Sequence, residues 1–451
     1  MATATKYKPY SKMKPSGVDW LGKIPDEWEA KRLRYYFDYH AGGVWGDEEN
    51  GNGNNMICFR VADFDFDHLG LAENDLTVRN IPENQHSRIL EKGDILLEKS
   101  GGGEKQTVGR AVRFNEGMRA VCSNFIEKLT PLKTHDSKFI SYLMGVLYFE
   151  TINTRSIKQT TGIQNLDLYS YLCEVVPFPS KEAQKAIADF LDRETAKIDG
   201  VVAKKQKLIE LLKEKRQALI THAVTKGLDP KAKMKPSGID WLGKIPEGWG
   251  VKRLKYISNT RVSNVDKKSE DEIPVKLCNY VDVYKNEFID DKIDFMIATA
   301  TRGQLDAFEL KKGDVILTKD SETPDDIGVP AYVNLEDTKN IVCGYHLAIS
   351  TPNKSILLGK YLFRLLQSSV FRAYFEIHSN GITRFGLDTY SIFNADIPLP
   401  LLSEQRTIAD FLDRETGKID EIIKKVETQI EKLQEYRQAL ISNAVTGKIK
   451  V

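Results

Sequence analysis

The sequence has almost no net charge, few cysteines and no long hydrophobic run. Lysine and arginine total 65 against 64 aspartate and glutamate, a formal net charge of +1, so the chain lacks the overall basic field of a simple DNA-binding protein. The five cysteines form no CxxC pair, which argues against a disulfide framework. No run approaches the roughly 18 apolar residues of a membrane span, and the N-terminal residues lack the apolar segment of a signal peptide. We therefore expect a cytoplasmic protein.

Sequence motifs of catalysis are missing as well. There is no GxxxxGK[ST] phosphate loop and no GxGxxG that closes a strand–helix unit. The seven histidines show no HExxH and no other metal-ligand spacing. We therefore predict no catalytic residue, no metal site and no cofactor in this chain.

The chain contains an internal sequence repeat. IADFLDRETAKID at Ile187–Asp199 returns as IADFLDRETGKID at Ile408–Asp420, and MKPSGVDWLGKIP at Met13–Pro25 returns as MKPSGIDWLGKIP at Met234–Pro246. Such self-similarity defines the architecture before any other signal. It predicts a first globular domain over residues 1–180, a long helix and linker over 181–233, a second globular domain over 234–401, and a second long helix with a tail over 402–451.

Each repeat closes with a long amphipathic helix. Apolar residues recur every seven positions, at Leu191, Ile198, Leu212 and Leu219 in the first repeat, and at Leu412, Ile419, Val426, Leu433 and Leu440 in the second. A sustained heptad with charged flanks is typical of a coiled coil, and in the first helix Lys205 interrupts it. Because each helix alone would leave its apolar stripe in water, we expect the two to pack on each other with internal pseudo-two-fold symmetry.

The residues between the opening segment and the long helix predict mostly β-structure in both repeats. Short β-branched or aromatic runs alternate with Gly, Asn and Asp, and a helical patch and a proline-flanked strand follow. The fold class is therefore α+β, with two mixed α/β domains. The MKPSG segments are interpreted as extended straps anchored by Trp20 and Trp241. Four cysteines recur in both repeats inside apolar runs, and we expect them to be buried small hydrophobes: Cys58, Cys122, Cys278 and Cys343. Cys173 has no match in the second repeat.

One stretch has the look of a metal-dependent nuclease core. Asp94, Glu98 and Lys99 lie together in GDILLEKS, but the second repeat has Thr318 in place of the second acid. We therefore interpret these acids as residues on the solvent face of a strand. The glycines that follow could cradle a phosphate with their N–H groups. The second repeat lacks them, so we favour a variable recognition loop.

The loops differ between the repeats although the scaffold does not, as expected of a protein that reads two different targets. Arg, Lys, Gln and Asn are the residue types that read base edges and contact phosphates. The candidate DNA-contacting residues in the first repeat are Arg60, Lys99, Ser100, Gly101, Lys105, Gln106, Arg110, Lys158, Gln159, Thr160, Thr161, Gln164 and Asn165. Those in the second repeat are Asn279, Tyr280, Lys319, Ser321, Ser379, Asn380, Thr383, Arg384 and Phe385.

Four segments carry a resemblance to a known family. The opening KYKPYSKMKPSGVDWLGKIPDEWEAKRLR, the repeated PSG-(V/I)-DWLGKIP, the helix start EQRTIADFLDRETGKID and the ending RQALISNAVTGKI are similar to those of the specificity subunit of type I restriction–modification systems. The resemblance spans the whole chain. It implies two target recognition domains, each reading one half of a bipartite, asymmetric site in double-stranded DNA. It also implies that the long helices form an antiparallel coiled coil that sets the gap between the half-sites.

The resemblance also implies partners. Two methyltransferase (modification) subunits, which carry S-adenosylmethionine, would dock on the helices, and restriction subunits, which use ATP and Mg²⁺, would join through them. No catalysis is implied in this chain itself. The charged residues at the two helix starts are candidates for docking these partners, and the alternative is that they only keep the helix surface soluble. They are Asp192, Arg193, Glu194, Asp413, Arg414 and Glu415.

Two other functions compete with this one. A coiled-coil scaffold that binds only proteins would not need two divergent loop sets rich in Arg, Gln and Asn. A nuclease that acts alone on DNA would need an acid or metal cluster in both repeats, and the sequence shows none.

Overall fold

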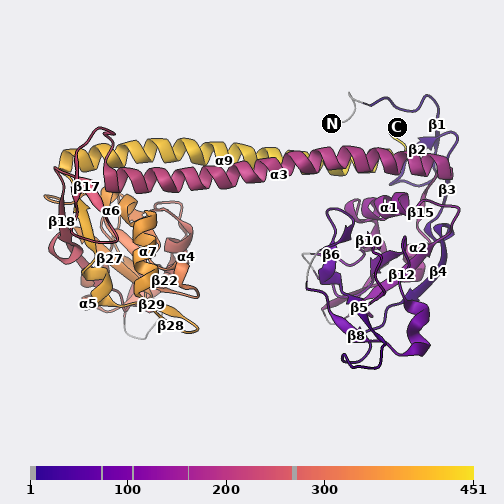
Figure 1. The fold of residues 1–451 in the computed structure, drawn as a ribbon, viewed down its shortest axis with the longest axis horizontal. Helices are drawn as coiled ribbons and strands as arrows, with labels where there is room; N and C mark the ends of the chain where they lie inside the picture. Colours follow the sequence, from indigo (N-terminus) through magenta and orange to yellow (C-terminus); the bar gives the residue numbers. More distant parts are fainter. Residues whose placement is uncertain (1–6, 73–74, 104–105, 161, 267–271) are drawn as a thin grey trace. The chain divides into compact units, whose positions relative to one another are not determined.

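The computed structural model describes residues 7–72, 75–103, 106–160, 162–266 and 272–451 (Figure 1). The chain forms two compact units. The first comprises Met1–Lys205 and Thr428–Val451, and the second comprises Gln206–Glu427. Each unit therefore combines one globular part with one stretch of each long helix.

The first unit is built from short strands packed on one main helix. Its strands are β1 (Met13–Pro15), β2 (Lys23–Pro25), β3 (Glu29–Arg32), β4 (Phe37–Gly42), β5 (Asn55–Phe59), β6 (Phe64–Asp65), β7 (Gly70–Leu71), β8 (Val78–Asn80), β9 (Ile95–Glu98), β10 (Ala111–Arg113), β11 (Ala120–Cys122), β12 (Ile126–Pro131), β13 (Ile157–Thr160), β14 (Ile163–Leu166) and β15 (Val175–Phe178). Its helices are α1 (Ser137–Phe149) and α2 (Leu168–Leu172), with 3₁₀ turns η1 (Leu33–Tyr36), η2 (Val61–Asp63), η3 (Glu83–Arg88) and η4 (Ile152–Ser156).

The second unit repeats this plan with variations. Its strands are β16 (Met234–Pro236), β17 (Lys244–Pro246), β18 (Gly250–Arg253), β19 (Ser258–Val262), β20 (Ile273–Cys278), β21 (Phe288–Ile289), β22 (Met296–Ala300), β23 (Val315–Thr318), β24 (Asp320–Ser321), β25 (Pro330–Val333), β26 (Ile341–Cys343), β27 (Leu347–Pro352), β28 (Ser379–Gly381), β29 (Phe385–Leu387) and β30 (Asp396–Leu399). Its helices are α4 (Tyr280–Lys285), α5 (Arg302–Phe308), α6 (Gly359–Leu366), α7 (Ser369–His378) and α8 (Thr389–Phe393), with 3₁₀ turns η5 (Leu254–Tyr256) and η6 (Pro324–Asp326).

The sheets of the two units correspond. The first unit has a sheet of order β10-β9-β12-β4 and a smaller sheet of order β11-β5-β8; the second has β19-β27-β23-β25-β21 and β22-β20-β26. The central strands β9 and β23 are buried along their whole length, because helices α1 and α6 and the smaller sheets cover them. In each unit the strand that follows the MKPSG segment also pairs with the last strand before the long helix, β3 with β15 and β18 with β30.

The two long helices are α3 (Lys181–Lys226) and α9 (Leu402–Val445). In the first unit Asp199 of α3 accepts hydrogen bonds from Arg437 of α9, and six residues later Lys205 donates to Gln429, so the helices run antiparallel. In the second unit Arg216 donates to Asp420 in the same way. The predicted seam residues Leu191, Ile198, Leu412, Ile419, Val426 and Leu440 are buried. The predicted helix pair and its antiparallel direction are therefore confirmed.

The opening segments are hairpins, which corrects the expectation of extended straps. β1 pairs with β2 and β16 with β17, both antiparallel. Gly17 and Gly22, with φ of +79° and +61°, allow the chain to reverse between β1 and β2. Trp20 does anchor the segment, since its indole nitrogen donates to the Val175 carbonyl at 3.2 Å.

Four of the five cysteines are buried and unpaired, as expected: Cys58, Cys122, Cys278 and Cys343. Burial raises the pKa of Cys58 and of Cys122 to about 12. In the described part of the chain, none of the helices combines the length and the apolar character needed to cross a membrane.

The cysteine environments give a first testable prediction. The thiolate is the reactive form of cysteine, and burial both blocks access and raises the thiol pKa. At pH 8 we expect iodoacetamide to label mainly Cys173, which is partly exposed, in the native chain and all five cysteines in urea. Mass spectrometry of the alkylated chain measures this, and rapid native labelling of Cys58 would contradict the packing described here.

Candidate nucleic-acid interface

In the first unit, the loop after β9 pairs with the hairpin β13–β14, which brings several predicted residues together. Gly101 N–H donates to the Gln164 carbonyl at 3.1 Å, and Leu166 N–H donates to the Lys99 carbonyl at 2.8 Å. The Ser100 hydroxyl donates to Asn165 Oδ1 at 2.7 Å. Two segments that lie about 60 residues apart therefore form one surface.

Within the hairpin the side chains alternate as the period of a strand requires. Gln164 and Leu166 are buried, whereas Ile163 and Asn165 are exposed. Gln164 Oε1 accepts a hydrogen bond from Val108 N–H at 3.3 Å. Gln164 therefore holds the loop against the hairpin, and Asn165 is the member of this pair that a ligand can reach.

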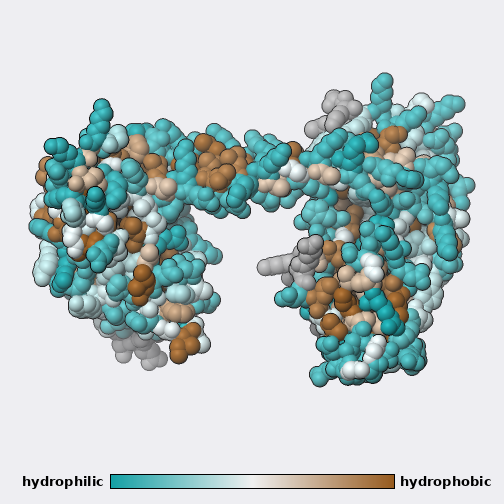
Figure 2. Space-filling model, viewed as in Figure 1, coloured by the Kyte–Doolittle hydropathy of each residue, from teal (hydrophilic) through white to brown (hydrophobic). Residues whose placement is uncertain are grey.

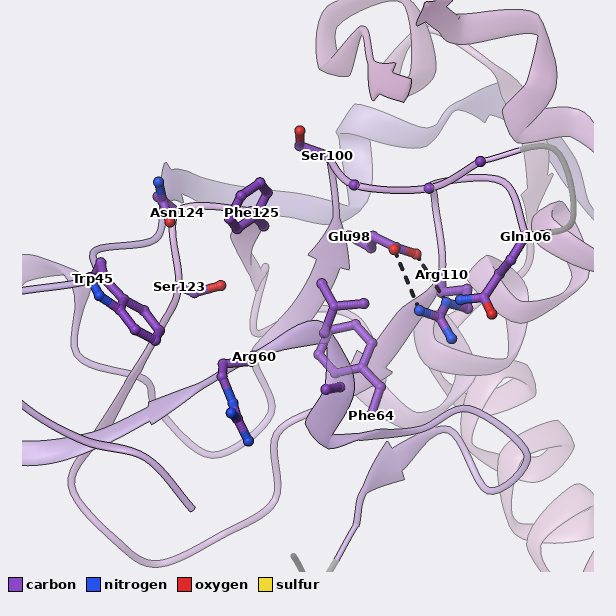
Figure 3. A pocket seen from close by; sticks show the side chains of 15 residues that line it. Trp45, Arg60, Phe64, Glu98, Ser100, Gln106, Arg110, Ser123, Asn124 and Phe125 are labelled. Carbon is purple, nitrogen blue, oxygen red and sulfur yellow. Dashed lines mark hydrogen bonds and ion pairs between the residues drawn. The ribbon is translucent and has the colours of Figure 1, made fainter. Parts of the chain in front are cut away.

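This surface borders a cavity of about 950 Å³ (Figure 3). Aromatic side chains and the glycine-rich loop form much of its wall, and the charged residues Arg60, Glu98 and Arg110 also line it. The remaining lining residues are Trp45, Val61, Ala62, Phe64, Ser100, Gly101, Gly102, Gly103, Gln106, Ser123, Asn124 and Phe125. Sequence reasoning missed Trp45, Asn124 and Phe125, because they come from loops that only the folded chain brings to one place.

The cavity wall contains a buried ion pair between Glu98 and Arg110. Arg110 Nε donates to Glu98 Oε2 at 3.0 Å, and the Glu98 side chain is only 3% exposed. The amide of Gln106, turned so that its oxygen faces the guanidinium, accepts from Arg110 Nη1 at 2.7 Å. The interpretation of Asp94 and Glu98 as residues on a solvent face is therefore wrong, because both side chains are buried.

The other members of the nuclease-like stretch have separate partners. Asp94 is buried, accepts from the Thr130 hydroxyl at 2.7 Å and lies 3.3 Å from Lys128 Nζ. Lys99 donates to Glu127 at 2.8 Å. Since each charge is neutralised by a different neighbour, the three residues do not converge on a common ion. Among the residues that the structure describes, no group of three or more His, Cys, Asp or Glu side chains is placed to hold a metal.

Other predicted residues of the first unit are held by local contacts. Arg60 forms an ion pair with the buried Asp63 at 2.8 Å and leaves part of its side chain in the cavity. Lys158 pairs with Asp167 at 2.6 Å, and this hydrogen bond is the main cause of a lowered Asp167 pKa. Gln159 is exposed on β13. Lys105 and Thr161 lie outside the described residues, as does the side chain of Thr160.

In the second unit, the predicted residues gather around the small sheet β24-β29-β28. Asp320, next to Lys319, accepts from His346 Nδ1 at 2.6 Å and lies 3.3 Å from Lys319 Nζ. Lys319 also lies over the Tyr345 ring, 5.6 Å from its centre, and Arg384 reaches His346 Nε2 at 3.5 Å. This surface has no counterpart of the glycine-rich loop, because Ser321 pairs with Phe385 in the sheet.

The remaining predicted residues of this unit have mixed roles. Asn279 caps α4 by accepting from Val281 N–H at 2.9 Å, and Tyr280 stacks on Tyr284 with ring centres 5.6 Å apart. Burial raises the pKa of Tyr280. Asn380, Thr383 and Arg384 are exposed, Ser379 is partly exposed, and Phe385 packs against the core.

The two units differ most at the position of the buried ion pair. Glu98 N–H donates to the Arg110 carbonyl, and Thr318 N–H donates to the Val329 carbonyl, so these backbone positions are equivalent. In the second unit the Thr318 hydroxyl simply accepts from Val329 N–H at 3.0 Å. One scaffold therefore supports a charged pair in one unit and a neutral contact in the other.

The helix starts do not leave all their charges free for a partner. Asp192 accepts from Lys138 and, at 2.9 Å, from the Tyr142 hydroxyl. Asp413 accepts from Lys360 and from Arg364, both at 2.8 Å. Both aspartates thus have partners within the chain, because α1 and α6 pack beside the helix starts and supply cations to them, while the Asp192 side chain stays 41% exposed. Docking by these aspartates stays a prediction.

Of the neighbouring charges of the helix starts, Arg193 and Arg414 are exposed, whereas the side chains of Glu194 and Glu415 are only 12% and 27% exposed. Arg193 pairs with Glu194 at 3.2 Å and Arg414 with Glu415 at 2.8 Å. A hydrogen bond from Lys197 is the main cause that lowers the pKa of Glu194 to about 2. These four residues occupy equivalent places in the two units, so they remain candidates for docking.

Sequence reasoning also missed a glutamine that fixes each helix start. Gln184 and Gln405 are fully buried. Gln184 Oε1 accepts from Asp136 N–H, and Gln405 Oε1 accepts from Leu358 N–H, both at 2.9 Å. Each glutamine thereby joins the long helix to the segment that opens α1 or α6. The sequence signal that could have indicated this role is the glutamine at the same position of both helix starts, in Ala183-Gln184 and Glu404-Gln405.

Comparison with known proteins supports a family assignment. The family model for the type I restriction modification DNA specificity domain matches residues 25–211 and again residues 246–432. The chain belongs to this family. Members of the family that resemble it along most of its length include the type I restriction enzyme MjaVIII specificity subunit of Methanocaldococcus jannaschii, 25% identical, with 95% of this chain and 94% of that protein covered. The EcoKI specificity subunit of Escherichia coli is 22% identical, with coverage of 82% and 78%.

Solved structures of the family share the fold. A chain from a study of complex assembly and conformational transition of the type I R-M system superposes with a TM-score of 0.69 at 14% identity, covering 94% of this chain and 98% of that one. The HsdS subunit from Thermoanaerobacter tengcongensis gives a TM-score of 0.50 at 16% identity, with the same coverage.

Proposed function

We propose that this chain is the DNA-recognition subunit of a type I restriction–modification complex, and that each globular part reads one half of a bipartite, asymmetric site in double-stranded DNA. One observation carries the proposal. The same scaffold presents two different sets of Arg, Lys, Asn and Gln side chains at equivalent loops and at equivalent hairpins, β13–β14 and β28–β29. Phosphate contacts position a protein on DNA, and contacts to base edges specify the sequence.

The long helices set the spacing of the half-sites and dock two methyltransferase subunits. Arg193 and Glu194, with Arg414 and Glu415, offer equivalent polar contacts to two equal partners. The second unit's stretch of the helices also exposes Leu208, Leu211 and Ile422, and Figure 2 shows hydrophobic surface on the helices. An apolar patch with a charged border is the usual composition of a protein interface.

The chemistry of the complex resides in its partners. S-adenosylmethionine belongs to the methyltransferase subunits, and ATP and Mg²⁺ belong to restriction subunits that join through them. This chain contributes sequence recognition without catalysis, in the cytoplasm where the DNA lies. A stand-alone nuclease is disfavoured because Asp94, Glu98 and Lys99 each pair with a different residue. A scaffold that binds only proteins leaves the two loop sets unexplained.

An exchange of one recognition part tests the proposal. Because β3 pairs with β15 and β18 with β30, the segments 29–178 and 250–399 each begin and end in a single small sheet. In the test variant, residues 29–178 are replaced by a second copy of residues 250–399. We expect its DNA site to consist of two halves that both have the sequence read by the second part. Genome-wide mapping of methylated adenines in a host that carries the methyltransferase measures this.

The reciprocal exchange is the matched control. It should give a site with both halves read by the first part. The proposal is wrong if the mapped site is unchanged, or if one exchange alters both halves to new sequences.

A further inference from the structure

The recognition hairpins of both units present an isoleucine at the tip. In the second unit β28 pairs with β29 up to Gly381 and Phe385, so Ile382 begins the connecting loop and is 94% exposed. In the first unit Ile163 begins β14 directly after Gly162 and is 52% exposed. The preceding glycines have φ of +155° and +85°.

The backbone of this loop requires glycine immediately before Ile382. A Cβ on Gly381 would lie 1.9 Å from the Arg384 carbonyl oxygen, so only glycine closes this loop. A single exposed apolar side chain is ordinary on a protein surface. Here a Gly–Ile dipeptide occurs at the turn of the same hairpin in both units, on opposite sides of the turn: Ile163 pairs with Thr160, whereas Ile382 precedes Phe385 in the unpaired loop. An isoleucine at the turn of two otherwise divergent hairpins points to a shared task.

The hairpins themselves fit a polyanion. No acidic residue occurs from Ile157 to Leu166 or from Ile377 to Leu387, and Asp320 on the neighbouring strand β24 is paired with Lys319 and His346. Arg384 supplies positive charge in the second unit, whereas Lys158 in the first is paired with Asp167 at 2.6 Å. Gln159 and Asn380 supply amides. Figure 1 places β28 and β29 at the end of the second unit remote from α3 and α9, and Figure 2 shows hydrophobic surface at this end. A ligand with an anionic exterior and an apolar interior matches this arrangement.

We propose that Ile382, and Ile163 in the first unit, are wedge residues that insert between adjacent base pairs of the half-site and unstack one step. The inference rests on the proposed function. Apolar wedges kink duplex DNA from the minor groove, and unstacking costs a few kcal/mol per step, offset by the contacts that the bent duplex allows. Isoleucine suits this role because its branched Cβ restricts χ1 and keeps the side chain stiff.

The test uses the full chain assembled with its methyltransferase subunits. 2-Aminopurine is placed at successive positions of the half-site read by the second part. Emission should rise at one step with the wild-type chain, fall to the level of free duplex with Ile382→Ala, and persist with Ile382→Leu. The control Ile377→Ala removes an isoleucine that is 78% exposed five residues earlier and should leave the signal unchanged. The adenine that is methylated is omitted, because methyltransferases extrude their target base.

The outcomes separate the two proposals. If Ile382→Ala binds the half-site and the emission is unchanged, the wedge is wrong and DNA recognition stands. If thymine-to-uracil replacement weakens wild-type binding as much as Ile382→Ala does, the side chain contacts a thymine methyl group, and the wedge is again wrong. If the wild-type complex does not discriminate the mapped site from other DNA, the proposed function itself fails.

Discussion

Asp413→Ala should lower the free energy of opening of the second unit by about 3–5 kcal/mol, the usual result of removing one partner from a buried charge pair. The substitution would leave the guanidinium of Arg364, a residue only 2% exposed, without its closest anion. Glu287 would remain 3.3 Å from Arg364, but it also serves Arg216. The cost arises because a buried cation that is only partly compensated has lost its hydration.

The first unit supplies a matched control. Asp192→Ala removes the equivalent carboxylate, whose partners are the exposed Lys138 and the neutral Tyr142 hydroxyl. We expect a loss of about 1 kcal/mol there, the usual value of a hydrogen bond. Hydrogen exchange of peptides from each unit measures both losses separately. Equal losses in the two units would contradict this account of the Arg364 network.

The pH dependence of the same pair has a defined sign. Burial opposes ionisation of Asp413, but hydrogen bonds from Lys360 and Arg364 outweigh it and leave the pKa lowered. Because the folded-state pKa of Asp413 lies below the unfolded value of about 3.9, its ionised carboxylate stabilises the fold at pH values above 3.9. The stabilisation is lost as the pH falls through the folded-state pKa. The difference between wild type and Asp413→Ala should therefore shrink under acid conditions.

Arg110→Val should destabilise the first unit by about 3–5 kcal/mol, and a second substitution, Glu98→Thr, should restore most of that loss. Alone, Arg110→Val leaves the Glu98 carboxylate buried without its cation. The double variant reproduces the neutral Thr318–Val329 contact that the second unit already contains. Buried ion pairs replaced by well-packed neutral residues are often close to neutral in stability.

Hydrogen exchange of β9 and β10 peptides in the wild type, both single variants and the double variant completes the cycle. The expected coupling is about 2 kcal/mol or more, at the upper end for residues in contact. Additive losses would show that the pair is not coupled. Because the double variant should fold, a change in the first half-site that it causes would report lost DNA contact by Arg110.

The sequence alone predicted the parts of the fold that depend on periodicity. The heptads at Leu412 and Ile419 gave the helix pair, since a seam repeats locally along the chain. The orientation of Glu98 was not predictable in this way, because its burial depends on sheets that close over β9 from distant segments. Asp192 and Asp413 looked free for the same reason: their cations lie on α1 and α6, about 50 residues earlier.

The candidate interface was predicted in composition and only partly in geometry. Ser100 and Asn165 were expected to act on DNA, and the fold brings them into contact. Gln164 was expected beside them, yet the strand period turns it inward. The aromatic wall of the cavity, with Trp45 and Phe125, carried no local signal, since its members are joined only by tertiary packing. DNA contact by each of these residues stays a prediction.

The discontinuity of the first unit has a consequence for protein synthesis. Its packing includes the last turn of α9 and the tail, where Lys448 Nζ donates to the Leu21 carbonyl at 2.6 Å and Ile449 is buried in the core. The second unit is one continuous segment, Gln206–Glu427. Domains usually fold in the order in which the ribosome releases them. The first unit therefore cannot complete its packing until residues 428–451 have been translated, although its globular part precedes the whole second unit in the sequence.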